Sequence, residues 1–449
     1  MPTQLIDNRK PVDRVVLVGA PSRWLDAHTA DEHLAELGRL TDTAGGHVEA
    51  VVQQRIDTPN PKLYIGEGKA QELKEVVETT GADLVIFDEE LSPAQGKNLE
   101  TAVGVRVMDR SELILDIFAT RARSREARMQ VELAQLEYLL PRLKRMWSHL
   151  SRTRGGIGLR GPGETQLETD RRLIGRRIAD LKRKLADVAA AREVQRLRRT
   201  GEFRAALVGY TNAGKSSLLR ALSGADVLVE DRLFATLDST TRAIDLGDGH
   251  QALLTDTVGF IRKLPHHLVA SFRSTLEEAR EADVLLHVID ASHPDREEHE
   301  NVVFEVLEDL ELDAIPQMLV YNKVDRLTHA EESALRERVR AFVNRPALFV
   351  SAHQPNTLEA LLEALKARIR ARLAKVRIEV PVADGEALAL VYREGEVLDR
   401  TDFDDRVALT ARLAERVVGR LRARDGVQIT EAAFLEPVEP VEPVEPLVP

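Results

Sequence analysis

The 449-residue sequence contains no cysteine, so it can form no disulfide bond and perform no thiolate chemistry. It also lacks an apolar run of the roughly 20 residues that a membrane-spanning helix needs. The first segment places Asp7, Arg9 and Lys10 before its first apolar run, which is not the pattern of a secretory signal peptide. These absences, with a hydrophobic content of 43%, predict a cytoplasmic protein of two or three domains.

An overall positive charge is absent as well, since the formal net charge is −11. The average conceals an asymmetry: residues 120–200 hold 21 Lys and Arg against 9 Asp and Glu, a net of +12, and the rest of the chain carries −23. A basic block in an acidic protein indicates a surface for an anionic polymer. A solvated helical face with surplus arginine is the alternative interpretation.

Short β-rich runs alternate with helical patterns in residues 1–118 and again in 201–374, which predicts an α/β domain with a parallel sheet in each. Residues 119–200 carry two apolar stripes with alternating spacings of four and three, and these predict an antiparallel coiled-coil hairpin. A small α+β domain (375–432) follows. The Pro/Glu-rich tail (433–449) is expected to be disordered.

The hairpin stripes can be buried only against one another, and Pro141 should kink the first helix. The connection Arg154–Glu164 holds five glycines and two arginines, which is longer than a hairpin turn requires. Such a tip is either a floppy connector or a backbone that approaches a partner closely. We favour the second interpretation because basic helices flank the tip.

The strongest motif follows the apolar strand Arg204–Val208 and opens a helix. It consists of Gly209, Tyr210, Thr211, Asn212, Ala213, Gly214, Lys215 and Ser216. Glycines in this context let backbone N–H groups surround a phosphate at a helix N-terminus. Lys215 would bridge the β- and γ-phosphates, and the Ser216 hydroxyl would complete a Mg²⁺ shell. The motif predicts a phosphate-binding loop.

Three further segments, each at the end of a predicted strand, indicate GTP as the nucleotide. They are Asp256, Thr257, Val258 and Gly259; then Asn322, Lys323, Val324 and Asp325; then Ser351, Ala352 and His353. Asp256 could hold Mg²⁺ through water, and the Gly259 N–H could sense the γ-phosphate. The Asp325 carboxylate could accept two hydrogen bonds from guanine, whereas adenine offers no matching pair.

Two features of the predicted site concern hydrolysis. The segment from Phe234 to Arg242 offers three threonines that could close on Mg²⁺, and residue chemistry alone does not rank them. Phe260 stands where many GTPases place a water-orienting glutamine, so the intrinsic rate should be low and should rise with a partner. His266, His267, His287 and His293 lack metal-ligand spacing and are expected to have surface or structural roles.

With these segments in view, the chain resembles the HflX family of translational GTPases from about Val12 to about Leu421. Its most specific stretches are Gly156–Glu168 and Phe272–Glu278. The resemblance implies an α/β fold in which a P-loop GTPase domain follows an N-terminal α/β domain with a coiled-coil hairpin. A small C-terminal α+β domain completes this architecture.

The resemblance also implies site residues, cofactors and a partner. It implies that Thr236 ligates Mg²⁺ together with Ser216. Thr236 belongs to a segment that would contact the nucleotide, which consists of Phe234, Ala235, Thr236, Leu237 and Asp238. Lys215, Thr236 and Gly259 would act on the reacting phosphate, and Asn212 matches an asparagine that ligates K⁺ in related GTPases. The implied partner is the large (50S) ribosomal subunit, at the 23S-type rRNA near the peptidyl-transferase region. The implied activity is splitting or rescue of stalled ribosomes by a protein that is monomeric when free.

Two other functions fit part of the sequence. One is a signalling switch that binds a protein effector and uses the coiled coil as a dimerisation arm. The other is an ATP-dependent RNA-remodelling activity of the N-terminal domain. The basic block favours RNA over an effector protein, since dimerisation does not require surplus arginine.

Overall fold

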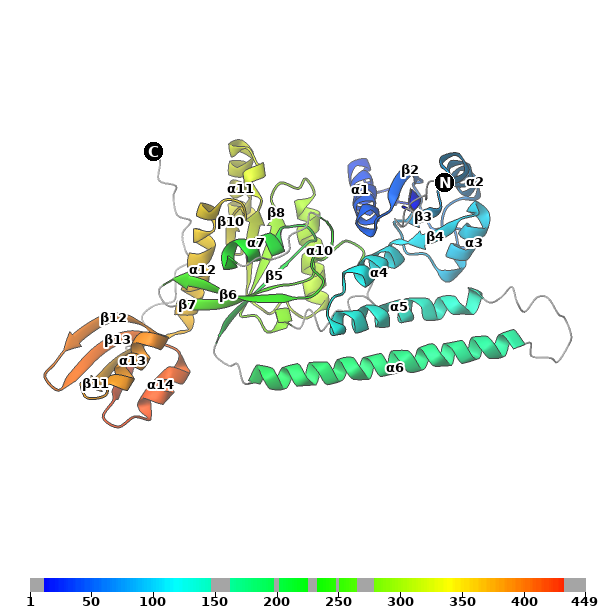
Figure 1. Cartoon of the computed structure of the whole chain (residues 1–449). Coiled ribbons are helices and arrows are strands. Elements are labelled where there is room, and N and C mark those ends of the chain that lie inside the picture. Colours follow the sequence, from blue (N-terminus) through cyan, green and yellow to red (C-terminus); the bar gives the residue numbers. More distant parts are fainter. Residues whose placement is uncertain are drawn as a thin grey trace, which may run out of the picture.

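The computed structural model describes residues 12–146, 162–197, 202–224, 232–247, 250–264 and 278–431 (Figure 1). Within these ranges three separate sheets follow one another along the chain, and a hairpin of two long helices comes after the first. Residues 147–161 of the hairpin tip, 265–277 and the Pro/Glu tail lie outside the described residues. None of the helices in the described ranges is long and apolar enough to cross a membrane.

The N-terminal sheet is parallel, with the strand order β2-β1-β3-β4. Its elements are β1 (Arg14–Gly19), α1 (Ala27–Ala44), β2 (His47–Gln53), α2 (Glu67–Thr80), β3 (Leu84–Phe87), α3 (Pro93–Val103), β4 (Arg106–Asp109) and α4 (Arg110–Arg121). Alternate residues of β1 enter cores on opposite faces, with Val15 and Leu17 on one side and Val16 and Val18 on the other. Burial on both faces explains why these strands appear in the sequence as continuous apolar runs.

The hairpin consists of α5 (Arg125–Met146) and α6 (Pro162–Leu197), which lie side by side (Figure 1). Besides packing against α6, α5 packs against the N-terminal sheet domain through residues outside its predicted stripe. Val131, Ala134 and Tyr138 lie in the same core as Leu113 and Ile117 of α4. The helix therefore has two apolar sides, one facing α6 and one facing the N-terminal sheet domain. The helix α5 continues through Pro141 to Met146.

The central sheet has the order β10-β9-β8-β5-β7-β6. Its elements are β5 (Phe203–Gly209), α7 (Lys215–Ser223), β6 (Thr240–Gly247), β7 (His250–Asp256), β8 (Val284–Asp290), α10 (Arg296–Asp309), β9 (Gln317–Asn322), the 3₁₀ turn η2 (Val324–Arg326), α11 (His329–Phe342), β10 (Ala347–Phe349), the 3₁₀ turn η3 (Pro355–Thr357) and α12 (Glu359–Arg372). Five of its strands, β5, β7, β8, β9 and β10, are parallel, as expected for this domain. The sixth, β6, is antiparallel and half-exposed, so it lacks the apolar run that marks the others.

The C-terminal sheet is antiparallel, with the order β12-β13-β11-β14. Its elements are β11 (Ala374–Pro381), α13 (Gly385–Glu394), β12 (Gly395–Asp402), β13 (Arg406–Leu413), α14 (Glu415–Arg422) and β14 (Gln428–Glu431). This βαββαβ succession with that strand order is the ferredoxin-like arrangement. Both helices share one core with the sheet, whereas Lys375 and Arg377 of β11 face away from it. The predicted α+β unit is therefore present, with β14 as an additional strand.

Candidate nucleotide site

The loop between β5 and α7 contains two glycines whose places no other residue could take. At Gly209 (φ +152°) a Cβ atom would lie 2.3 Å from the carbonyl oxygen of Val288. At Gly214 (φ +96°) it would lie 2.2 Å from Nδ2 of Asn322. The loop therefore sits tightly against β8 and β9, and the next residue, Lys215, begins α7. This is the strand–loop–helix arrangement that surrounds a phosphate with backbone N–H groups.

The ammonium of Lys215 is buried within this loop. Its Nζ donates to the carbonyl oxygens of Gly209 at 3.0 Å and Tyr210 at 2.9 Å. Burial lowers the pKa of Lys215 to about 8, because a buried cation loses hydration. A bound phosphate would restore the lost electrostatic stabilisation, so the loop is built to attract an anion.

A hydroxyl–carboxylate cluster lies beside Lys215. The Ser216 hydroxyl donates to Oδ2 of Asp256 at 2.6 Å and lies 2.7 Å from Oγ1 of Thr236. The other oxygen of Asp256, Oδ1, is buried without a hydrogen-bond partner among the described residues. Burial raises the pKa of Asp256. A carboxylate with one unpartnered oxygen, close to the hydroxyls of Ser216 and Thr236, fits a hard cation such as Mg²⁺.

The structure distinguishes Thr236 from Thr241, two of the three threonines that residue chemistry left equivalent. Thr236 reaches Ser216, whereas Oγ1 of Thr241 lies 2.8 Å from Oγ1 of Thr255 between β6 and β7. Asp238, a predicted site residue of the same segment, accepts hydrogen bonds from the backbone N–H groups of Arg123 and Ser124 at 2.9 and 3.1 Å. It thus ties this segment to the start of the hairpin and does not face the phosphate loop.

The segments predicted to recognise the base meet at the ends of β9 and β10. Asn322 donates from Nδ2 to the Ala213 carbonyl at 2.9 Å and accepts at Oδ1 from the Ala352 N–H at 3.2 Å. Lys323 Nζ donates to the Asn212 carbonyl at 2.8 Å. The Asp325 carboxylate accepts from the Ser351 hydroxyl. These contacts join the motif after β9 to the phosphate loop on one side and to the segment after β10 on the other.

A cavity of about 350 Å³ opens where all four segments meet. Lys215, Thr236 and Gly259 line one part of it, and Asp325 and His353 line another. The predicted residues Tyr210, Leu237 and Val258 are buried and do not line this cavity. The sequence thus predicted residues that the fold brings together, although they are spread over more than a hundred positions.

Phe260 turns away from the cavity. Its side chain is fully buried in the core, while its N–H donates to the Gly209 carbonyl at 3.1 Å and its carbonyl accepts from the Thr211 N–H at 2.7 Å. Gly259 stands so close to the loop that a Cβ there would lie 2.7 Å from Cα of Thr211 and 3.0 Å from Nζ of Lys215. The position after Gly259 therefore contributes packing and offers no side chain to a water molecule.

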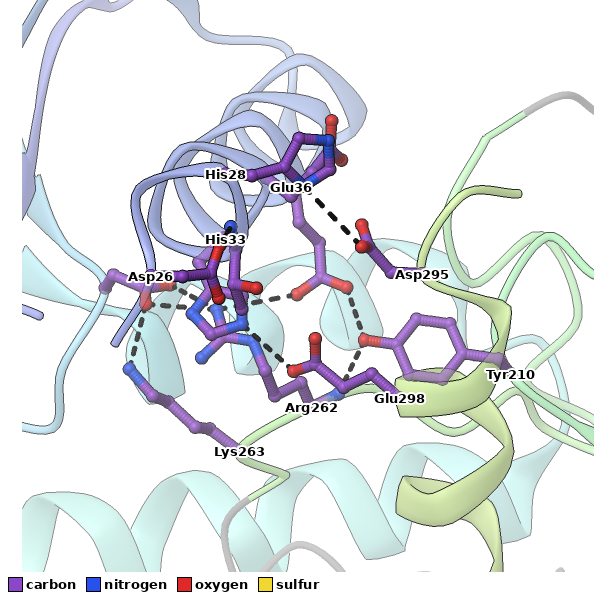
Figure 2. A network of polar contacts seen from close by, with 12 residues as sticks. Asp26, His28, His33, Glu36, Tyr210, Arg262, Lys263, Asp295 and Glu298 are labelled. Carbon is purple, nitrogen blue, oxygen red and sulfur yellow. Dashed lines mark hydrogen bonds and ion pairs between the residues drawn. The ribbon is translucent and has the colours of Figure 1, made fainter. Parts of the chain in front are cut away.

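The N-terminal sheet domain contacts the phosphate loop through buried charges (Figure 2). The Tyr210 hydroxyl donates to the Glu36 carboxylate and accepts from the Arg262 N–H at 2.9 Å. Arg262 also reaches Asp88, which follows β3, and Lys263 donates to the same carboxylate at 2.9 Å. Glu36 and Asp88 share a further cation, the buried Arg110 guanidinium. The segment after Gly259 is thus held by carboxylates of another domain.

Sequence reasoning missed several residues at this site. Arg232 and Arg326 line the cavity, and Asp290 at the end of β8 accepts from Lys323 Nζ at 2.6 Å. Asp290 could have been noticed, because it ends a predicted strand at the edge where the motifs gather. His287 and His293 have structural roles. His287 is buried in β8, and the ring of His293 packs against the ring of His299 with the centroids 4.3 Å apart. The described residues contain no metal-binding cluster of His, Cys, Asp and Glu, and His266 and His267 lie outside them.

Three family models match consecutive parts of the chain. "GTP-binding GTPase N-terminal" covers residues 31–119, "GTP-binding GTPase Middle Region" covers 121–199, and "50S ribosome-binding GTPase" covers 204–323. The first corresponds to the N-terminal sheet domain from α1 onward, the second to the hairpin, and the third to the sheet that carries the cavity.

Whole-length relatives agree with these matches. A protein of Alkalihalophilus pseudofirmus is 45% identical over 88% of this chain and 92% of its own length. A protein of Caldanaerobacter subterraneus is 46% identical over 91% of this chain and 93% of its own length. A protein of Escherichia coli is 46% identical over 81% of this chain and 85% of its own length. Each is named GTPase HflX. The chain therefore belongs to the HflX family of GTPases, enzymes that hydrolyse GTP.

Proposed function

We propose that this GTPase binds the large ribosomal subunit near the peptidyl-transferase region and splits or rescues stalled ribosomes under the control of GTP. A family model for 50S ribosome-binding GTPases matches residues 204–323, which include the phosphate loop, and this supports the ribosome as the partner. The observation that carries the regulated activity is the burial of Phe260, because the site offers no water-orienting side chain after Gly259. Hydrolysis then depends on what the ribosome contributes.

The hairpin supports an RNA partner. Arg171, Arg172 and Arg176 of α6 are exposed and have no ion-pair partner among the described residues. Arg177, in contrast, is paired with Glu132 of α5 at 2.6 Å. Exposed guanidinium groups with no carboxylate partner are suited to phosphate contacts, which would fix the protein on rRNA.

In the proposed reaction a water molecule attacks the γ-phosphorus of GTP, and the products are GDP and phosphate. Lys215 would hold the β- and γ-phosphate oxygens, and the Gly259 N–H would face the γ-phosphate. Asp325 would accept from guanine N–H groups and thereby set base specificity. Ser216 and Thr236 would ligate Mg²⁺, which offsets phosphate charge when bound. A K⁺ ion near Asn212 is a further proposed cofactor.

The test of regulated hydrolysis is GTP turnover of the full chain with and without purified large subunits. We expect a slow intrinsic rate and a rise of at least about tenfold at saturating subunit, with small subunits as the control. An intrinsic rate that subunits leave unchanged would refute ribosome-stimulated hydrolysis.

Sedimentation through sucrose at several salt concentrations separates ribosome binding from a signalling function. We expect the chain, monomeric when free, to pellet with the large subunit in the presence of a non-hydrolysable GTP analogue and to dissociate as salt rises. Replacement of Arg171, Arg172 and Arg176 by glutamine should lower the salt needed for release. A chain that stays in the supernatant at every salt concentration would favour a protein effector instead. If ribosome association is confirmed, the protein acts in the cytoplasm.

A further inference from the structure

The cavity has more cationic side chains than the nucleotide motifs account for. Lys215 belongs to the phosphate loop, and Lys323 is engaged by Asp290 at 2.6 Å. Arg326 follows Asp325 directly and belongs to the base end of the cavity. The remaining guanidinium is that of Arg232, which lines the cavity, is exposed, and has no hydrogen bond or ion pair within the described part of the chain.

The backbone next to Arg232 is held in an uncommon conformation. Phe234 has φ +54°, a left-handed value that is rare for a bulky side chain. Its N–H donates to the Thr211 hydroxyl at 3.0 Å, and its buried ring meets Phe118 edge-on with ring centroids 4.6 Å apart. Strain of this kind persists only where surrounding contacts impose it, and it gathers at functional sites. The turn fixes the course of the chain between Arg232 and Thr236.

The chain on the other side of Thr236 is also anchored, because Leu237 is buried in the core and Asp238 is bound by backbone N–H groups of the hairpin. Arg232 lies four residues before Thr236 in this anchored segment, and the Thr236 hydroxyl lies 2.7 Å from the Ser216 hydroxyl. Both side chains line the same cavity as Gly259. From its short, anchored connection to Thr236 we assign Arg232 to the γ-phosphate end of the cavity, whereas Arg326 adjoins Asp325 at the base end.

We propose that Arg232 is a catalytic residue that contacts the transferring phosphate of GTP from within the same chain, an inference that rests on GTP binding in this cavity. During hydrolysis the water oxygen forms a bond to the γ-phosphorus while the bond to the β–γ bridging oxygen breaks. The electron pair stays on that oxygen of GDP. One proton of the water remains on the attacking oxygen, and the other passes to another oxygen of the released phosphate. Arg232 donates N–H hydrogen bonds to the oxygens on which negative charge grows, and it remains protonated throughout.

This assignment complements the burial of Phe260. A site without a glutamine does not orient the attacking water through that side chain. An arginine of the same chain can still stabilise the negative charge of the transition state. Lysine would be a poor replacement, because its ammonium is a compact point charge and cannot present the planar fork of a guanidinium.

The test is single-turnover GTP hydrolysis by the full chain with Arg232→Gln, Arg232→Lys and Arg232→Ala, measured with and without large subunits. We expect the glutamine variant to lower the hydrolysis rate by about 1,000-fold or more under both conditions, because an arginine finger contributes roughly 10³–10⁵ to the rate. The dissociation constants of GTP and GDP should change by less than about threefold. Arg242→Gln is the matched control, because Arg242 is an exposed arginine of β6 that does not line the cavity.

Two readouts separate catalysis from a structural role. The wild-type chain should bind aluminium fluoride together with GDP, whereas the Arg232→Gln variant should bind GDP alone. Added methylguanidinium should restore part of the rate of Arg232→Ala and leave Arg242→Gln unchanged.

Three results would overturn the assignment. One is a hydrolysis rate for Arg232→Gln within about twofold of the wild type. Another is a loss of GTP affinity that accounts for the whole effect at an unchanged rate of the bound complex. The third is a wild-type rate that collapses when Na⁺ replaces K⁺ while Arg232→Gln has no effect, which would assign the charge to an ion near Asn212. Loss of GTP binding by the wild-type chain itself would instead refute the nucleotide site.

Discussion

Arg262, three residues after Gly259, donates from Nη2 to both carboxylate oxygens of Asp88, at 3.2 Å to Oδ1 and 3.1 Å to Oδ2. Both side chains are buried, at 9% and 3% exposure. Burial favours the neutral acid at Asp88, but Arg110, Arg262 and Lys263 outweigh it, so the pKa of Asp88 lies far below its ordinary value. The contact between the N-terminal sheet domain and the segment after Gly259 is thus an ionic core that excludes water.

Replacing Asp88 by asparagine should destabilise the protein strongly. The substitution removes one of the two carboxylates that face the buried guanidinium groups of Arg110 and Arg262, so that Glu36 alone balances both. Breaking a buried pair in this way costs about 3–5 kcal/mol. Urea unfolding of the full chain measures the loss. The control is Glu332→Gln, which removes the partner of Arg336 in a partly exposed pair of α11 and should change stability by less than about 1 kcal/mol. Equal losses for the two variants would contradict a buried ionic core.

Replacing Asp325 by asparagine should change which nucleotide the site accepts. The amide can no longer accept two hydrogen bonds from guanine, and the mismatch is expected to cost about 2–3 kcal/mol of GTP affinity. Xanthosine triphosphate presents a carbonyl where guanine presents an amine, so its affinity should rise. Titration with fluorescent analogues of both nucleotides tests this. GTP binding as tight as in the wild type would exclude base recognition by Asp325.

Replacing Asp256 by asparagine should lower the affinity for Mg²⁺ more than the affinity for the nucleotide. Oδ1 of Asp256 is buried and has no hydrogen-bond partner in the part of the chain that the structure describes, and Oδ2 accepts from Ser216, so the carboxylate can orient a Mg²⁺ shell. Loss of such a group typically lowers metal affinity about 10–100-fold. The measurement is the Mg²⁺ concentration that halves the release rate of a fluorescent GDP analogue. Asp399→Asn, an exposed residue of β12, is the control. A midpoint equal in both variants would show that Asp256 does not act on the metal.

The segments that line the cavity could be found in the sequence because each follows a strand, and the ends of parallel strands meet at one edge of a sheet. The sequence could not predict contacts that depend on how domains dock. Nothing in the sequence around Tyr210 indicates that its hydroxyl reaches Glu36, which lies 174 positions earlier. The second apolar side of α5 was missed for the same reason, because Val131, Ala134 and Tyr138 are recognisable as a core face only when α4 is in place. Thr236 was predicted as the Mg²⁺ threonine from the family resemblance alone. In the structure the turn at Phe234 directs the chain so that the Thr236 hydroxyl lies beside Ser216.

His287 should make stability depend on pH. Both ring nitrogens are buried without partners among the described residues, and burial lowers the pKa of His287 to about 3 from 6.5. Below pH 6.5 the unfolded chain binds a proton that the folded chain rejects, so the free energy of unfolding falls as pH falls. For this group the loss is about 2 kcal/mol between pH 6.5 and 5. Above pH 6.5 both states are neutral, and the contribution vanishes.

The measurement is urea unfolding at pH 7.5, 6.5, 5.5 and 5.0 for the wild type and for His287→Leu. The leucine cannot be protonated, so the pH dependence should flatten by about the amount given above, while the carboxylate contributions remain in both proteins. His329→Gln, at an exposed position that begins α11, should retain the full slope. If the slopes of the wild type and His287→Leu coincide, the histidine is hydrated or paired in solution, and the burial of its ring does not determine its titration.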